Sequence, residues 1–270
     1  MADLAALRAR LRQIDRVVVA FSGGADSAFL AWVAHDTLGR DGAARAVTAV
    51  SPSLAPAELE DCASLAREWD LQWSTVRTDE LDRPEYVAND GDRCAHCKTA
   101  LMDALTPIAS AAGSTTVVLG VNVDDLGDRR PGQEAAAARG AVFPLVDTGF
   151  TKADVRSESR RLGLRTWDKP AAACLASRLP YGTPVTIGVL DRVARAEASL
   201  HQLGFRQVRV RHYGDVARIE LDPDDLAAAV ARRSDVVDAV HAAGYQYVTL
   251  DLDGFRSGNL NTALTRLEVR

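Results

Sequence analysis

Short apolar runs alternate with longer amphipathic segments through the first 121 residues, and few folds are compatible with that order. The run RVVVAF (16–21) precedes a helical segment that ends at Gly39, and further apolar runs follow at 44–52, 71–78 and 115–121. The segments between these runs have helical spacing. Strands separated by helices of this length predict βαβ units. The sequence therefore predicts an α/β fold with a doubly wound parallel sheet covered on both faces.

The pattern changes in the second half of the chain. Residues 123–184 are dense in glycine, proline and charge, which is typical of segments that build sites. A helix over about 188–203, two strands, a helix over 223–243 and a last strand should then form a smaller α+β unit. We predict two domains, residues 1–184 carrying the cysteine site and residues 185–270.

The charge balance argues against nucleic acid as a partner. The chain has 32 basic and 37 acidic side chains and a formal net charge of −5, so it lacks a broad positive field for a phosphate backbone. The amphipathic N-terminal segment has no apolar stretch of the signal-peptide type, and no run reaches the roughly 18 apolar residues of a membrane span. We expect a cytoplasmic protein without a membrane partner, whose thiols stay reduced.

The first apolar run is followed directly by SGGADS, residues 22–27. Two glycines allow the backbone to approach a ligand closely, and the start of the next helix offers N–H groups and a positive dipole end. A Walker loop would need a lysine after the glycines, and none is present. The loop therefore predicts a pyrophosphate site and adenylation chemistry, against the simpler interpretation of a capped turn.

Four cysteines are present, and three lie where chemistry is expected. Cys94 and Cys97 form a CxxC pair, whose spacing fits a redox couple, half of a zinc site or part of an iron-sulfur site. Cys174 lies near Lys169 and Arg178, and nearby cations favour a reactive thiolate. Cys62 lies within a helical segment and is expected to be a small buried side chain.

The SGGADS string resembles the PP-loop, SGGxDS, of the N-type ATP pyrophosphatases, which cleave ATP between the α and β phosphates. The resemblance implies a set of pyrophosphate-binding residues, with Asp26 also a magnesium ligand. This set comprises Ser22, Gly23, Gly24, Asp26 and Ser27.

Further motifs make the resemblance more specific. Together with RCAHCK, DDLGDRRPG, WDKPAAACLASRLPYG and VRVRHYGDVARIEL, the loop makes nearly the whole chain similar to the LarE family of ATP-dependent sulfur transferases. The resemblance implies that ATP and Mg²⁺ activate a carboxylate of a small nucleotide, pyridinium biscarboxylate mononucleotide. Sulfur transfer then gives a thiocarboxylate during synthesis of the nickel-pincer nucleotide cofactor. Members of the family assemble as homo-oligomers.

The family has two sulfur sources, and the cysteines bear on the choice. In one branch a single cysteine at the position of Cys174 gives up its own sulfur; in the other, three cysteines hold a 4Fe-4S cluster. Cys94, Cys97 and Cys174 match the cluster branch. A sacrificial Cys174 without a cofactor remains an alternative, as does zinc completed by Cys62 or His96.

Several further residues are candidates for ligand contact. Asp124 and Asp125 follow the fourth strand, where magnesium or substrate binds in such sheets, although a solvated acidic turn is equally compatible. By resemblance, Arg130 lies near the nucleotide substrate, and Arg178 is a further candidate for nucleotide binding.

Val208 and Val210 alternate with Arg209 and Arg211, which predicts an amphipathic strand with one buried and one solvated face. By resemblance, Arg209, Arg211, Asp215 and Glu220 border the site or a subunit contact, and an ordinary charged sheet face is the alternative. We assign none of them a catalytic role. A tRNA thiolase or another adenylating enzyme of the PP-loop fold, or a non-catalytic nucleotide-binding module with a structural metal, remains the alternative function.

Overall fold

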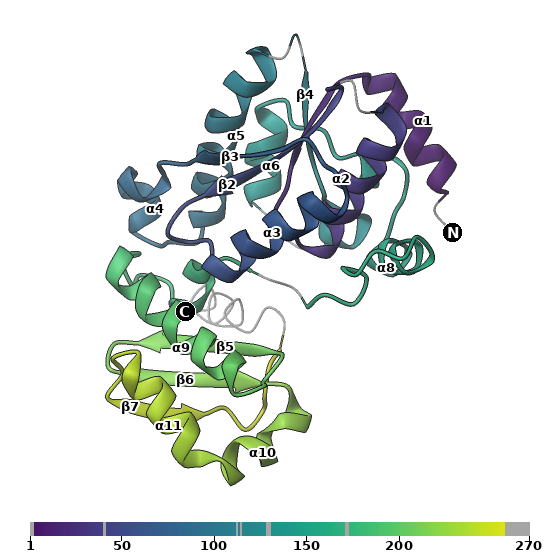
Figure 1. Cartoon of the computed structure of the whole chain (residues 1–270). Helices are drawn as coiled ribbons and strands as arrows, with labels where there is room; N and C mark the ends of the chain where they lie inside the picture. Colours follow the sequence, from purple (N-terminus) through teal and green to yellow (C-terminus); the bar gives the residue numbers. More distant parts are fainter. Residues whose placement is uncertain are drawn as a thin grey trace. The chain divides into compact units, whose positions relative to one another are not determined.

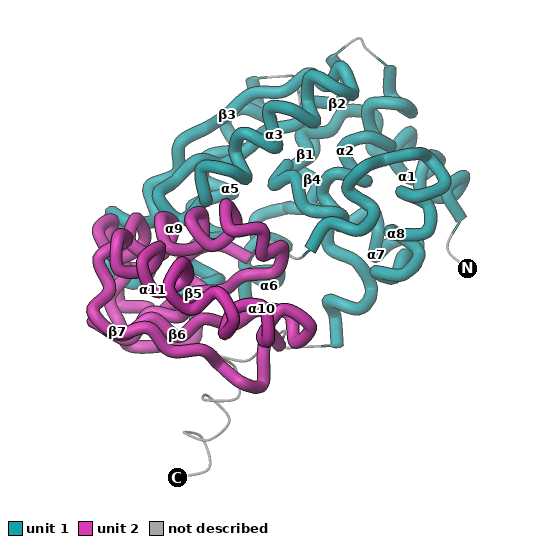
Figure 2. Tube along the Cα trace, turned by 60° about the horizontal axis from the view of Figure 1, so that its bottom comes forward, with its two compact units in different colours: residues 1–86, 92–172 teal, residues 87–91, 173–270 magenta. Residues whose placement is uncertain are grey.

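The computed structural model describes residues 3–39, 42–111, 113, 115–127, 131–170 and 173–256 (Figure 1). Contacts divide the chain into two compact units (Figure 2). The first unit comprises Met1–Tyr86 and Asp92–Ala172, and the second comprises Val87–Gly91 and Ala173–Arg270. Residues 173–184, predicted from sequence to belong to the first domain, are thus grouped with the second unit.

The first unit is built on a four-stranded sheet in the order β3-β2-β1-β4. Its strands are β1 (Val17–Ala20), β2 (Ala44–Val50), β3 (Trp73–Arg77) and β4 (Thr116–Leu119). All three pairings are parallel. The predicted parallel α/β fold is confirmed, and each predicted strand of this unit is present.

Helices cover both faces of this sheet (Figure 1). The longer ones are α1 (Leu4–Ile14), α2 (Ala25–Leu38), α3 (Pro56–Glu68), α5 (Arg93–Ala111), α6 (Pro131–Ala138) and α8 (Lys152–Arg161). Alternate residues of β1 point to opposite faces. Val17 and Val19 belong to a core with α1 and α2, whereas Val18 belongs to a second core with Leu105 of α5. The sheet is therefore doubly wound.

The order of the strands identifies the place at the carboxyl ends of the sheet where a ligand is expected to bind. From β1 the chain builds β2 and β3 on one side, and it then returns to place β4 on the other side of β1. Ligands of doubly wound sheets bind at the carboxyl ends of the strands where the order reverses. In this protein that position lies between the loops that follow β1 and β4.

The second unit has a three-stranded sheet in the order β5-β6-β7. Strands β5 (Val208–Tyr213) and β6 (Val216–Leu221) are antiparallel, and β7 (Tyr247–Leu250) is parallel to β6. The helices are α9 (Ile187–Gln202), α10 (Leu226–Ala231) and α11 (Arg233–Ala242). The single helix predicted over 223–243 is wrong, because Arg232 leaves helical geometry between α10 and α11 and donates to the carbonyl oxygen of Leu203.

A segment from the middle of the chain belongs to the second unit. The side-chain amide of Asn89 donates to the carbonyl oxygens of Pro180 and Thr183, both at 2.8 Å. The backbone N–H of Gly182 donates in return to the carbonyl oxygen of Asn89. Since Asn89 is fully buried, these bonds fix residues 87–91 beside residues 180–185.

Candidate functional site

The SGGADS loop joins β1 to α2 at the predicted edge of the sheet. Gly23 has a φ of +70°, a conformation that favours glycine. Gly24 is the N-cap residue of α2 and supplies no side-chain cap. The hydroxyl of Ser27 donates to the carbonyl oxygen of Gly24 at 3.1 Å and lies 3.0 Å from the hydroxyl of Ser22. This arrangement leaves the start of α2 suited to an anion.

The loop after β4 packs closely on the SGGADS loop. A Cβ atom placed on Gly120 would lie 2.7 Å from the backbone nitrogen of Ser27 and 2.8 Å from the backbone carbon of Asp26. Real side chains do not approach a backbone so closely, so only glycine allows the two loops to meet here. The structure therefore brings the segments after β1 and β4 together, as the strand order predicts.

Asp26 lies at the centre of a group of polar side chains. Its carboxylate accepts from the ammonium of Lys152 at 2.6 Å and from the side-chain amide of Asn122 at 3.3 Å. The backbone N–H of Lys152 donates to Asp124 at 2.8 Å, and the backbone N–H of Asn122 donates to Asp125 at 3.1 Å. Lys152 thus links Asp26 with Asp124, and Asn122 links Asp26 with Asp125.

Lys152 and Asn122 are site residues that the sequence reasoning missed. Lys152 is the first residue of α8, after the N-cap Thr151. A cation is unfavourable near the positive end of a helix dipole unless an anion lies beside it. That unfavourable position was the signal that could have identified Lys152. The buried Asn122 carried no comparable signal.

Lys169 lies next to the SGGADS loop. Its ammonium is 3.7 Å from the position of a Cβ on Gly23, and it donates to Asp61 at 2.6 Å and Glu58 at 2.8 Å on α3. Burial lowers the pKa of Lys169, but the hydrogen bonds to Asp61 and Glu58 outweigh it, and the pKa is raised. Lys169 therefore joins α3, through two ion pairs, to the segment that precedes Cys174 in the chain.

Cys62 also lies against the loop. Its Sγ is 2.9 Å from the position of a Cβ on Gly23, and its side chain is fully buried. Burial raises the pKa of the Cys62 thiol to about 11, and a hydrogen bond with Thr48 opposes the shift only in part. The expected buried cysteine is confirmed, and it leaves no room for a side chain at Gly23.

Alkylation should distinguish Cys62 from the other thiols. With iodoacetamide at pH 8, metal-free protein is expected to react at Cys94, Cys97 and Cys174 and to spare Cys62. At a pKa near 11 only about 0.1% of this thiol is ionised at pH 8. Peptide mass spectrometry of native and unfolded samples measures the difference. Equal rates at Cys62 and Cys174 would contradict the buried placement.

Cys94 and Cys97 lie at the start of α5, in the first unit. Helices that connect parallel strands begin at the carboxyl edge of the sheet, which is the edge of the SGGADS loop. The two residues are three positions apart, so their side chains share a helix face. A Cβ on Gly132 of α6 would lie 2.9 Å from the carbonyl oxygen of Cys94, which shows how closely α6 packs on this turn.

Cys174 lies in the second unit, directly before the 3₁₀ turn Leu175–Arg178. Its side chain is exposed. Arg178 is buried and forms hydrogen bonds with Glu197 and with the backbone around Cys174. Arg130 lies outside the described residues.

The strand that carries Arg209 and Arg211 differs from its predicted amphipathic pattern. Both arginines are buried, and Glu220 on the neighbouring strand is fully buried. Arg211 donates to Glu220 at 2.7 Å, and the guanidinium of Arg209 lies over the ring of Phe255. The predicted solvated face is therefore wrong, because ion pairing and ring contact allow these charges to be covered. Asp215 accepts two backbone bonds through its carbonyl oxygen.

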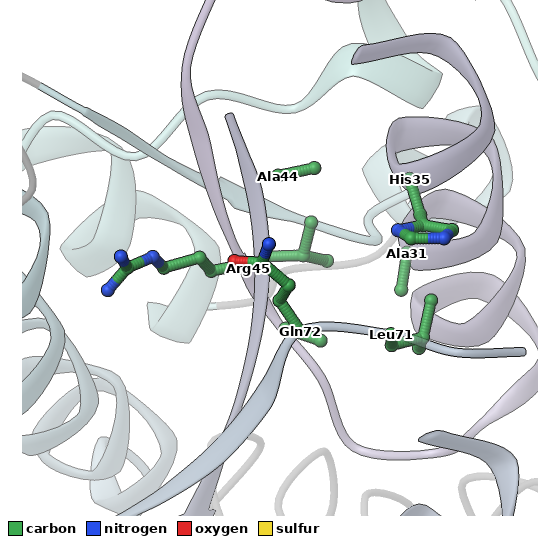
Figure 3. Close-up of a pocket in the computed structure, with 8 residues that line it drawn as sticks. Ala31, His35, Ala44, Arg45, Leu71 and Gln72 are labelled. Atoms are coloured by element: carbon green, nitrogen blue, oxygen red, sulfur yellow. The ribbon is translucent and has the colours of Figure 1, made fainter. Parts of the chain in front are cut away.

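A small pocket lies elsewhere in the first unit (Figure 3). It is lined by the start of β2, the residues before β3 and His35 near the end of α2. The lining side chains leave essentially no cavity volume, whereas small ligand sites have roughly 300 Å³. The pocket lies near the amino ends of β2 and β3, at the opposite edge of the sheet from the candidate site, and is a small packing gap.

The described residues contain neither a cluster of metal-binding side chains nor a membrane-spanning helix. No three His, Cys, Asp or Glu side chains among them gather as a metal-binding group. Within the same part of the chain, every helix is too short or too polar to cross a membrane.

Comparison with known proteins places the chain among close relatives. No family model matches it. The chain is 47% identical over 262 residues to an uncharacterized protein of Synechocystis sp., covering 96% of this chain and 97% of the relative. It is 38% identical over 265 residues to the pyridinium-3,5-bisthiocarboxylic acid mononucleotide synthase of Lactiplantibacillus plantarum, covering 98% and 96%.

The NMN synthetase of Francisella tularensis aligns with a TM-score of 0.47 and 17% identity, over 62% of this chain and 74% of that chain.

Proposed function

This chain belongs to the family of pyridinium-3,5-bisthiocarboxylic acid mononucleotide synthases, the LarE family, and on that premise we propose the reaction at its candidate site. The protein adenylates a carboxylate of pyridinium-3,5-biscarboxylic acid mononucleotide with ATP and releases pyrophosphate. Adenylation turns a carboxylate oxygen, a poor leaving group, into AMP. A sulfur nucleophile then displaces AMP and leaves a thiocarboxylate.

The observation that carries the proposal is the meeting of the SGGADS loop with Gly120 at the reversal of strand order. The start of α2 would bind the β and γ phosphates, which leave as pyrophosphate. Lys152 is 2.6 Å from Asp26 and would neutralise phosphate charge when the nucleotide is bound. Ser22, Gly23, Gly24 and Ser27 would contribute backbone and hydroxyl donors.

The acidic residues suit Mg²⁺, which prefers oxygen ligands. Asp26, Asp124 and Asp125 are linked through Lys152 and Asn122, so their carboxylates lie at one edge of the sheet. When bound with ATP, the ion would neutralise charge on the departing pyrophosphate. We propose that Asp26 binds it, with Asp124 or Asp125 in support.

The accessible cysteines suit an iron-sulfur cluster, because thiolates are its usual ligands. Cys94 and Cys174 are exposed and Cys97 is half-buried, whereas Cys62 is buried. We propose that Cys94, Cys97 and Cys174 hold a 4Fe-4S cluster. With three protein ligands, such a cluster supplies an iron that can carry an additional sulfide. We also propose a homo-oligomeric assembly.

Elemental analysis of protein purified without oxygen tests the sulfur source. About four irons per chain, with matching acid-labile sulfide, are expected. Zinc measured in the same sample provides the alternative: zinc at about one per chain in place of iron would make the CxxC pair structural. If metal stays absent after reconstitution, loss of one sulfur from Cys174 after a turnover, read by intact mass, would favour the sacrificial route.

A further inference from the structure

The backbone around Cys174 is held by a buried guanidinium. Arg178 Nη1 donates to the carbonyl oxygens of Ala173 at 2.6 Å and Cys174 at 2.9 Å. The same nitrogen lies 2.9 Å from the hydroxyl of Ser177. The thiol of Cys174 is exposed, whereas its main chain is held by the buried guanidinium of Arg178.

Glu197 fixes this guanidinium in turn. Its two carboxylate oxygens accept from Nε and Nη2 of Arg178 at 2.8 and 2.9 Å. The arginine side chain is 4% exposed and the glutamate 8%. Glu197 lies on α9 and also accepts from the backbone N–H of Val210 on β5. This bidentate pair therefore connects the Cys174 segment to the core of the second unit.

A second buried pair holds the other end of the same turn. Arg211 Nη1 donates to the carbonyl oxygen of Ser177 at 2.8 Å, and Nη2 donates to Glu220 at 2.7 Å. Glu220 is fully buried. Residues 173–178 are thus attached to both β5 and α9 through charged side chains.

Buried ion pairs are weak sources of stability, because removing two charges from water offsets their attraction. They do impose one geometry, since few other arrangements satisfy both groups. Chemical steps depend strongly on such placement: an error of about 1 Å can lower a rate about 100-fold.

We propose that Glu197 is a positioning residue, which acts through Arg178 to fix the backbone at Cys174 for sulfur transfer. The inference rests on the proposed function, because it takes Cys174 as part of the sulfur site. It also assigns Arg178 a role different from the nucleotide contact expected from sequence. All the groups involved lie in the second unit, whereas the SGGADS loop lies in the first.

Two variants and a matched control test the proposal. Glu197→Gln keeps the size of the side chain but removes its charge, and Arg178→Lys keeps a cation but loses the bidentate fork. The control, Asp191→Asn, removes an exposed ion pair with Arg195 on the same helix. Each protein is measured for hydrogen exchange of the peptide covering 173–179, for ATP–pyrophosphate exchange and for thiocarboxylate formation.

In both variants the 173–179 amides should exchange faster than in the wild type. Thiocarboxylate formation should fall about 10- to 100-fold, while ATP–pyrophosphate exchange stays within about twofold because the SGGADS loop is built by other elements, β1, α2 and the segment after β4. Asp191→Asn should match the wild type in all three measurements.

Two results would overturn the proposal: unchanged hydrogen exchange in both variants, or thiocarboxylate formation that falls no further than ATP–pyrophosphate exchange. If Glu197→Gln fails to fold, the same three measurements on Arg178→Lys test the proposal. A wild-type protein that forms no thiocarboxylate overturns the proposed function instead, and hydrogen exchange then decides the positioning without any turnover.

Discussion

Changing Cys174 to alanine is expected to stop thiocarboxylate formation while ATP–pyrophosphate exchange continues. The thiol is needed whether it binds the cluster or gives up its own sulfur, so product should fall by about 1,000-fold or more. The change should not reach the first half-reaction, because the SGGADS loop is built by β1, α2 and the segment after β4. Product is measured by mass spectrometry, and exchange with labelled pyrophosphate.

Companion variants separate the two sulfur sources. If Cys94, Cys97 and Cys174 share a cluster, Cys94→Ala should lose iron and product together. If Cys174 alone is sacrificed, Cys94→Ala should retain a single turnover. Thiocarboxylate made by Cys174→Ala at the wild-type rate would show that the sulfur assignment is wrong, whatever the metal content.

Asp26→Asn is expected to lower ATP–pyrophosphate exchange by about 100-fold or more. The carboxylate is the proposed magnesium ligand, and it also holds Lys152 at 2.6 Å. The amide that replaces it is a weak ligand for a hard cation and has no charge to attract the lysine. Exchange with labelled pyrophosphate at saturating ATP measures the loss.

Asp36→Asn provides the control for this change. Asp36 lies on the same helix as Asp26, near its other end, and pairs with Arg8 in a partly exposed ion pair. Such pairs contribute little, so exchange should remain near the wild-type rate. If Asp26→Asn and Asp36→Asn exchange pyrophosphate equally well, Asp26 does not take part in nucleotide activation.

The parts of this molecule that follow local patterns could be predicted from sequence. The apolar runs and helical spacing predicted the sheet of the first unit because β1 and β4 consist almost entirely of buried residues, on both faces of the sheet. The SGGADS string predicted a glycine-dependent turn, and Gly23 has the positive φ that such a turn needs.

Parts that depend on distant partners could not be predicted in the same way. Arg211 is buried because its guanidinium pairs with Glu220 on the neighbouring strand, two positions from the residue directly opposite, and no local pattern gives that pairing. Lys152 meets Asp26 across 126 positions of the chain. Arg232 leaves helical geometry between α10 and α11, and its side chain donates to the carbonyl oxygen of Leu203. In each case a charged side chain pairs with a group on another element, which only the folded chain brings close.

The placement of residues 87–91 has a consequence for how this protein is made and inherited. The chain passes between the two units after residues 86, 91 and 172. During synthesis Asn89 leaves the ribosome long before Pro180 and Thr183. Its side-chain amide can therefore form these two hydrogen bonds only after the second half of the chain has been made. A fragment starting at residue 173 would lack that amide altogether. A recombination event that exchanged the second unit intact would therefore need three breakpoints instead of one.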